Sequence, residues 1–210
     1  MLTTIARLLC AAAVLFGAAS RALAQDRMPA IPADTLTDAQ KRAIEEFKKA
    51  RSAEVSGPFV PLLRSPEVMS RARAMGDYLR YKSVLPPRLS EFVILLTARR
   101  WTQNYEWNAH APLARQAGLS PDIISAIVEG RRPEQMPDDE DALYTFCDEL
   151  HRNQSVSDAT YARALARFGE QGIIDTLGIT GYYTMLAMVL NTARTPVPPG
   201  ATPALKPFPR

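Results

Sequence analysis

The chain has 210 residues, of which 47% are hydrophobic and 22% charged, and its formal net charge is only +3. This length is sufficient for one domain with a sizeable core. The weak charge, with no basic run interleaved with aromatic residues, argues against a nucleic-acid partner.

The first 24 residues have the pattern of a secretory signal. Arg7 provides a positive charge, residues 8–19 are apolar, and Ala22-Leu23-Ala24 forms a small-x-small cleavage site. The apolar run is shorter than the roughly 20 residues that span a bilayer, and Arg21 follows it. We therefore predict an exported protein, periplasmic or secreted, with no membrane attachment after cleavage.

Cleavage after Ala24 would remove Cys10 and leave Cys147 as the single cysteine. A chain with one cysteine forms no internal disulfide, so its fold depends on its core or on partners. Cys147 falls on the apolar face of a predicted helix, where a buried thiol acts as a small hydrophobic side chain.

Helical periodicity dominates the rest of the sequence. Residues 25–36 contain two prolines and are predicted to form an exposed leader, after which Thr37 and Gln40 form a capping box. Pro66 stands where a first helical turn tolerates proline, and we expect Val68, Ala72, Met75 and Leu79 along one face of that helix. The predicted helices span residues 38–51, 66–82, 89–101, 104–116, 121–130, 138–152, 158–168 and 171–192.

The segment 89–101 is apolar nearly all round and is predicted to be the buried centre of the fold. A strand over residues 92–96 is the alternative, but the length of the segment favours helix. We find no alternating strand elsewhere and predict an all-α fold with one helical domain over residues 37–194. Residues 195–210 are proline-rich and should form an extended tail, which either wraps a neighbouring subunit or is disordered.

Four polar residues in the centre have a distinctive spacing. Glu91 is followed by eleven residues, Gln103, two residues, Glu106, three residues and His110. Residues four apart share a helix face, so Glu106 and His110 can exchange a proton.

Glu91 shares a face with apolar residues of its own helix and is expected to be partly buried. Burial raises the pKa of a carboxyl group unless a positive group pairs with it. The alternative role for Glu91 is an ion pair with Arg99 or Arg100 of a neighbouring subunit.

The stretch 89–120 resembles the carboxymuconolactone decarboxylase family, which includes an alkyl hydroperoxidase D branch. That peroxidase branch has two cysteines where this chain has Gln103 and Glu106, whereas Glu91 and His110 match its other two positions. The decarboxylase branch lacks the cysteine pair and is similar to Glu106-Trp107-Asn108-Ala109-His110. More loosely, the resemblance covers residues 62–194.

The resemblance implies a single helical domain of this family's type and decarboxylation or lactone turnover of a small organic acid without a cofactor. In the family reaction, a carboxylated unsaturated lactone loses carbon dioxide and a proton returns to carbon. His110 would be the general acid/base, Glu106 would orient it or share its proton, and Glu91 would be a second carboxylate of the pocket.

Other residues are candidates for substrate binding. Arg99 or Arg100 could neutralise a substrate carboxylate, although either could instead complement a helix dipole. The remaining candidates for the pocket wall, for which core packing is the alternative, are Gln103, Tyr105, Trp107 and Tyr183. We predict no metal, because the two histidines, His110 and His151, are far apart with no spaced acidic cluster.

Two other functions remain open. Export argues against the family's intracellular substrate, so a non-catalytic protein that binds a small molecule is the main alternative. Thiol-based peroxide reduction ranks last, because Gln103 and Glu106 cannot form a disulfide. The resemblance also implies a homo-oligomer, either a trimer or a hexamer.

Overall fold

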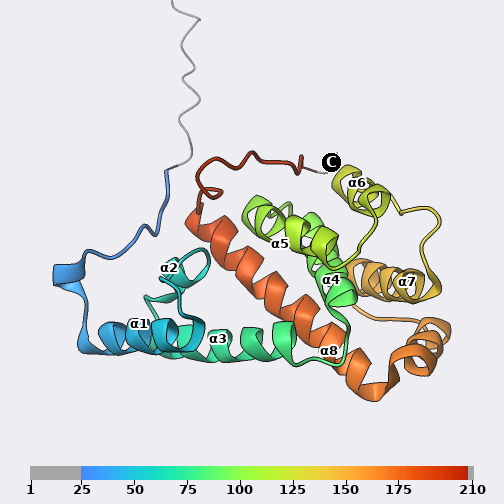
Figure 1. Cartoon of the computed structure of the whole chain (residues 1–210), viewed down its shortest axis with the longest axis horizontal. Helices are drawn as coiled ribbons and strands as arrows, with labels where there is room; N and C mark the ends of the chain where they lie inside the picture. Colours follow the sequence, from blue (N-terminus) through green and yellow to red (C-terminus); the bar gives the residue numbers. More distant parts are fainter. Residues whose placement is uncertain (1–24, 208–210) are drawn as a thin grey trace, which may run out of the picture.

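The computed structural model describes residues 25–207, and within these residues every regular element is helical (Figure 1). The predicted all-α fold is therefore confirmed. The predicted signal, residues 1–24, lies outside the described residues, so export stays a prediction.

The predicted helices are all present, with ends that differ by two residues or fewer from those expected. The elements are η1 (Ala33–Thr35), α1 (Asp38–Arg51), α2 (Phe59–Leu62), α3 (Pro66–Tyr81), α4 (Pro87–Arg100), α5 (Asn104–Gln116), α6 (Pro121–Glu129), α7 (Asp138–Asn153) and α8 (Asp158–Ala193). The two short elements η1 and α2 were not predicted, because three or four residues carry no periodicity. The predicted break near residue 169 is a kink within α8, where Gly169 has φ 66°.

Local sequence signals explain where the helices begin. The Thr37 side chain accepts a hydrogen bond from the Gln40 N–H, and the Gln40 side chain accepts one from the Thr37 N–H. Ser157 caps α8 through the Thr160 N–H in the same way. These caps satisfy N–H groups that have no partner inside the first helical turn.

Helix α4 lies at the centre of the molecule, in contact with α5, α7 and α8, as predicted from its all-round apolar surface. Phe92, Val93 and Leu95 are completely buried. In Figure 1, α8 crosses the molecule diagonally, with α1 and α3 on one side and α4 to α7 on the other. This arrangement places α3, α5 and α8 around the polar residues of α4.

The predicted inner face of α3 was partly wrong. Val68 and Met75 are each 45% exposed, although both were expected to face inward. The buried residues of this helix are Met69, Ala72, Gly76 and Leu79. Val68 and Met75 each precede a buried residue by one position, which rotates them about 100° away from the buried stripe.

The proline-rich tail has no helix or strand up to Pro207, turns at residues 199–200 and folds back onto its own chain. The Asn104 side chain accepts a hydrogen bond from the Leu205 N–H at 2.8 Å and donates one to the Leu205 carbonyl at 3.3 Å. The Leu205 side chain is buried. The described part of the tail therefore covers the start of α5.

Helix α8 is long and apolar enough to pass a simple test for a membrane span, the only helix within residues 25–207 that does. More than half of its apolar window, 56%, is buried against the rest of the molecule. Core helices of folded domains pass the same test, and the contacts of α8 with α3, α4 and α7 fit that role.

An ion-paired cluster joins the start of α4 to the start of α7. Arg88 binds Asp139 at 2.6 Å and also pairs with Glu140, which is only 2% exposed. A buried carboxylate is stable in its charged form only with such a partner.

Candidate active site

Helices α4 and α5 bring three of the predicted residues together. His110 Nδ1 lies 2.7 Å from a carboxylate oxygen of Glu91, and His110 Nε2 lies 3.5 Å from Glu106 Oε2. All three side chains are buried. Glu91 thus pairs with His110 of its own chain.

A cavity of about 190 Å³ adjoins Glu106 and His110. It lies between α5, α8, α3, the end of α1 and the loop before α2. Its lining residues are Phe47, Arg51, Ser56, Gly57, Pro58, Phe59, Arg80, Tyr105, Glu106, Ala109, His110, Tyr182, Tyr183 and Leu186.

The two carboxylates determine the charge state of His110. Burial alone would lower the pKa of His110, but its hydrogen bonds to Glu106 and Glu91 outweigh this effect and raise it. The imidazolium form is therefore favoured. Glu106 Oε1 is buried and has no hydrogen-bond partner among the described residues, so one acceptor beside the imidazolium remains available to a ligand.

We expect the pKa values of the two histidines to be shifted in opposite directions from the ordinary value of about 6.5. The pKa of His151 is lowered by burial and by Arg100, whereas that of His110 is raised. The protein has two histidines, so ¹H–¹⁵N NMR can follow both rings.

His110 stabilises the fold fully below about pH 6.5, and this contribution is lost as pH rises through its folded pKa. In Glu91→Gln the His110 pKa should fall; an unchanged pKa would contradict the pairing.

Two arginines that line this cavity were not predicted from the sequence. Arg80 Nε is buried without a hydrogen-bond partner among the described residues. Burial works to lower the pKa of Arg80, but Tyr183 and the nearby carboxylates outweigh it, so the guanidinium remains charged. Arg51 is held against Asp77 at 2.9 Å. No sequence motif marks either arginine, because only the packing of α1 and α3 beside α5 and α8 places them here.

The predicted aromatic residues divide between the cavity and the core. Tyr105 and Tyr183 line the cavity, and the Tyr183 ring meets the His110 ring edge-on at 5.0 Å. Trp107 is buried in the hydrophobic core and does not line this cavity. Gln103 caps α5 through the Tyr105 N–H and donates to Asn191 at 2.7 Å, so both ends of its amide are occupied by the protein.

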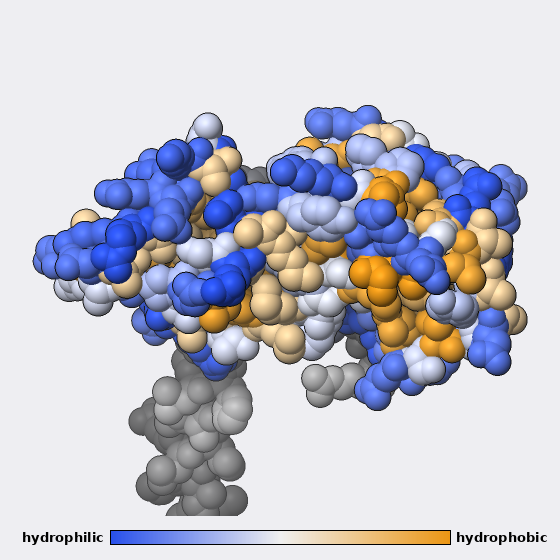
Figure 2. Space-filling model, turned by 90° about the horizontal axis from the view of Figure 1, so that it is seen from below, coloured by the Kyte–Doolittle hydropathy of each residue, from blue (hydrophilic) through white to orange (hydrophobic). Residues whose placement is uncertain are grey.

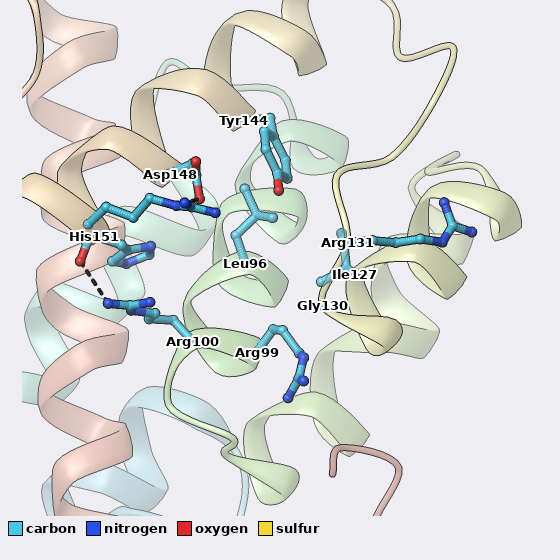
Figure 3. Close-up of a pocket in the computed structure, with 10 residues that line it drawn as sticks. Leu96, Arg99, Arg100, Ile127, Gly130, Arg131, Tyr144, Asp148 and His151 are labelled. Carbon is cyan, nitrogen blue, oxygen red and sulfur yellow. Dashed lines mark hydrogen bonds and ion pairs between the residues drawn. The ribbon is translucent and has the colours of Figure 1, made fainter. Parts of the chain in front are cut away.

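Arg99 and Arg100 lie away from His110, which corrects their predicted role in this pocket. They line a different cavity, between the ends of α4, α6 and α7 (Figure 3). The reason is distance along α4: eight or nine residues after Glu91 correspond to roughly 12–14 Å of helix. His151 also lines that second cavity.

Gly76 makes room for the aromatic wall of the site. A Cβ atom at Gly76 would lie 2.3 Å from the Tyr182 hydroxyl oxygen, and the Tyr182 ring packs against Tyr183 at 5.2 Å. We expect Gly76→Ala to lower the free energy of unfolding by about 1–3 kcal/mol, because a tightly packed ring must shift. Chemical denaturation measures this. Gly181→Ala is the matched control, since no atom lies within 4 Å of its added Cβ, and should not destabilise.

Comparisons with known proteins agree with this geometry. Residues 66–134, which contain Glu91, Gln103, Glu106 and His110, match the model of the carboxymuconolactone decarboxylase family. No curated protein matches the sequence.

Several solved structures share the fold. The alkylhydroperoxidase AhpD core protein of Ralstonia eutropha JMP134, an uncharacterised peroxidase-related protein, is 19% identical with a TM-score of 0.63, over 79% of this chain and 88% of its own. A peroxidase-related protein from Silicibacter sp. TM1040 is 18% identical with a TM-score of 0.64. The match covers 81% of this chain and 91% of that protein. This chain therefore shares the AhpD-like fold, and about a third of it resembles the carboxymuconolactone decarboxylase family.

A third structural neighbour is the debrominase Bmp8, solved as a single-residue variant in complex with 2,3,4-tribromopyrrole. It is 11% identical with a TM-score of 0.62, over 83% of this chain and 92% of its own. At this identity the likeness concerns the fold alone.

The cysteine chemistry of the peroxidase branch has no counterpart in the described part of this chain. Cys147 is the one cysteine in residues 25–207, and it is completely buried. Burial raises its pKa to about 12, so the thiolate required for peroxide reduction does not form near neutral pH. Across the same residues, no group of three or more histidine, cysteine or acidic side chains is arranged to hold a metal ion.

Proposed function

We propose that this protein is an enzyme that performs acid/base chemistry on a small organic acid in the cavity beside Glu106 and His110. Decarboxylation or lactone turnover is the reaction class that the family relationship favours. The observation that carries the proposal is the pairing of His110 with one oxygen of the buried Glu106 carboxylate, Oε2, while the other oxygen, Oε1, has no hydrogen-bond partner among the described residues.

The roles follow from the contacts. Glu91 holds His110 through Nδ1, so the ring presents Nε2 to Glu106. In a decarboxylation, the bond between the substrate and its carboxylate breaks and carbon dioxide leaves. The electron pair passes into a conjugated carbonyl of the substrate, and Glu106 or His110 then donates a proton to carbon. The base is reprotonated from solvent, so the cycle needs no redox partner.

The surroundings favour a small anionic substrate. The cavity volume of about 190 Å³ is below the usual range for drug-sized ligands. Arg80 supplies a charged guanidinium in the same cavity, and arginine suits carboxylate recognition. The rings of Tyr105 and Tyr183 provide flat apolar walls for an unsaturated or cyclic body.

A thermal-shift screen of the purified protein tests this proposal. The panel contains unsaturated lactones, muconate-type acids and hydroperoxides, with His110→Ala measured in parallel. An acid or lactone that stabilises the original protein and not the variant, and is then converted as judged by carbon dioxide release or by NMR, supports the proposal. Equal shifts in both proteins, or binding without turnover, would favour the non-catalytic alternative.

Homo-oligomer formation is a further part of the proposal. Apolar side chains of α8 and of the loop before α4 lie exposed, with Ile174 at 63% and Val84 at 49%. Figure 2 shows hydrophobic residues gathered on the underside, on the same side of the molecule as α7 and the first half of α8. Exposed patches of this kind commonly mark subunit contacts. Light scattering coupled to gel filtration should report a mass above one chain.

A further inference from the structure

A second cavity, of about 410 Å³, lies at the opposite end of α4 from Glu91 (Figure 3). It is formed where the last turns of α4 and α7 meet the end of α6. Its lining residues are Leu96, Arg99, Arg100, Ile127, Gly130, Arg131, Tyr144, Asp148, His151 and Arg152. None of the residues that surround His110 takes part in it, so it is separate from the proposed active site.

The side chains that line this cavity include more cations than anions. Four arginines line it against a single carboxylate, Asp148, which binds Arg152 at 2.9 Å. Arg131 pairs with Glu129 at the rim. Three helix C-termini add about half a unit of negative charge each, which offsets much of the remaining positive charge but leaves Arg100 as a cation at the rim.

Arg100 and His151 are the groups best placed to bind an anion. Arg100 donates to the His151 main-chain carbonyl at 3.1 Å, a contact that leaves its positive charge uncompensated. Nε2 of His151 is buried and has no hydrogen-bond partner among the described residues. Figure 3 shows both side chains on the same side of the cavity, whereas Arg99 points away from them.

The opposite part of the cavity is apolar. Leu96 and Ile127 form its floor, and the Tyr144 ring stands over them in Figure 3. A site with a cationic side and an apolar, aromatic side matches a ligand with both characters. We propose that this cavity binds a small carboxylate with a flat apolar body, held by Arg100 and His151 and packed against Leu96 and Tyr144.

NMR of the two histidine rings tests the proposal, because each cavity contains one of them. The full chain is titrated at fixed pH and ionic strength with benzoate, with benzamide as the neutral analogue and with inorganic phosphate as an anion without an apolar body. We expect benzoate to shift the His151 signals in a saturable way. Benzamide and phosphate should bind at least about tenfold more weakly. Benzamide lacks the negative charge that Arg100 would bind, and phosphate lacks the apolar body.

Two variants assign the contact. Arg100 is exposed at the rim, so Arg100→Gln should leave the fold intact, and it should weaken benzoate binding by about tenfold or more. Arg100→Lys, which retains the charge, should recover part of the affinity. His110→Gln alters only the other cavity and should leave the His151 response unchanged.

Several outcomes would overturn the proposal. These are a His151 signal that does not move with benzoate, an equal response to benzamide, or an affinity unchanged in Arg100→Gln. A response to phosphate as strong as that to benzoate would also overturn it, because the apolar floor would then contribute nothing. If benzoate shifts only His110, the ligand belongs to the proposed active site and not to this cavity.

Discussion

Turnover should fall by about 10²–10⁴-fold when Glu106 is replaced by glutamine, the range over which general acid/base groups contribute. The substitution preserves the size of the side chain but removes both its negative charge and its ability to carry the proton. Glu106 is only 4% exposed, so water has little access to substitute for the missing carboxylate. Steady-state kinetics with a substrate found in the screen would measure the loss.

The pH profile separates a chemical role of Glu106 from a structural one. Removing one of the two carboxylates that raise the pKa of His110 should move the titration of His110 to lower pH. The rate profile of Glu106→Gln should therefore shift as well as drop. A variant with the original rate, or with a lower rate and an unshifted profile, would remove Glu106 from the mechanism. Glu46→Gln on α1, away from the cavity, is the matched control and should leave both measurements unchanged.

The largest effect on stability is expected at Arg88. In Arg88→Met the carboxylate of Glu140 remains buried without its cationic partner, and breaking a buried pair in this way costs about 3–5 kcal/mol. Asp139 loses the same partner, so the start of α7 would carry uncompensated negative charge. Urea denaturation followed by circular dichroism would give the change in the free energy of unfolding.

Two further variants make this experiment specific. Arg71→Met removes an ion pair to Glu67 whose side chains are 80% and 72% exposed, and pairs of this kind contribute at most about 1 kcal/mol. The double variant Arg88→Met/Glu140→Leu replaces both charges with apolar groups and should recover most of the lost stability. A loss in Arg88→Met no larger than that in Arg71→Met would mean that Glu140 is solvated or protonated in the folded protein.

The sequence allowed most of the fold to be predicted, because its helices carry strong local signals. The capping box at Thr37, the prolines that open α3 and α6, and Gly130 after α6 mark helix ends through interactions within a few residues. The choice between Met69 and Val68 as an inward side chain could not be made in this way. Both positions are apolar, and the packing of α3 against α1 and α8 decides which one is buried.

The residues of the candidate site also differ in whether local sequence signals or tertiary packing determine their positions. Glu106 and His110 could be placed together because one helix holds both, and the family spacing associated Glu91 with them. Arg80 and Arg51 were missed because they come from helices whose relative placement no local pattern encodes. The same limit explains why Arg99 and Arg100 were assigned to the wrong cavity. Their position on α4 was predicted, but tertiary packing decides that they face α6 and α7.

The contact between Asn104 and Leu205 has a consequence for the order in which the protein is assembled. The two residues are 101 positions apart, so their hydrogen bonds cannot form until 101 further residues have been synthesised. At about 5–20 residues per second, this takes roughly 5–20 s. During that interval the first turn of α5, two residues before Glu106, has no cover from the tail. A fragment that ends with α8 would lack this contact permanently, and its first turn of α5 would stay uncovered.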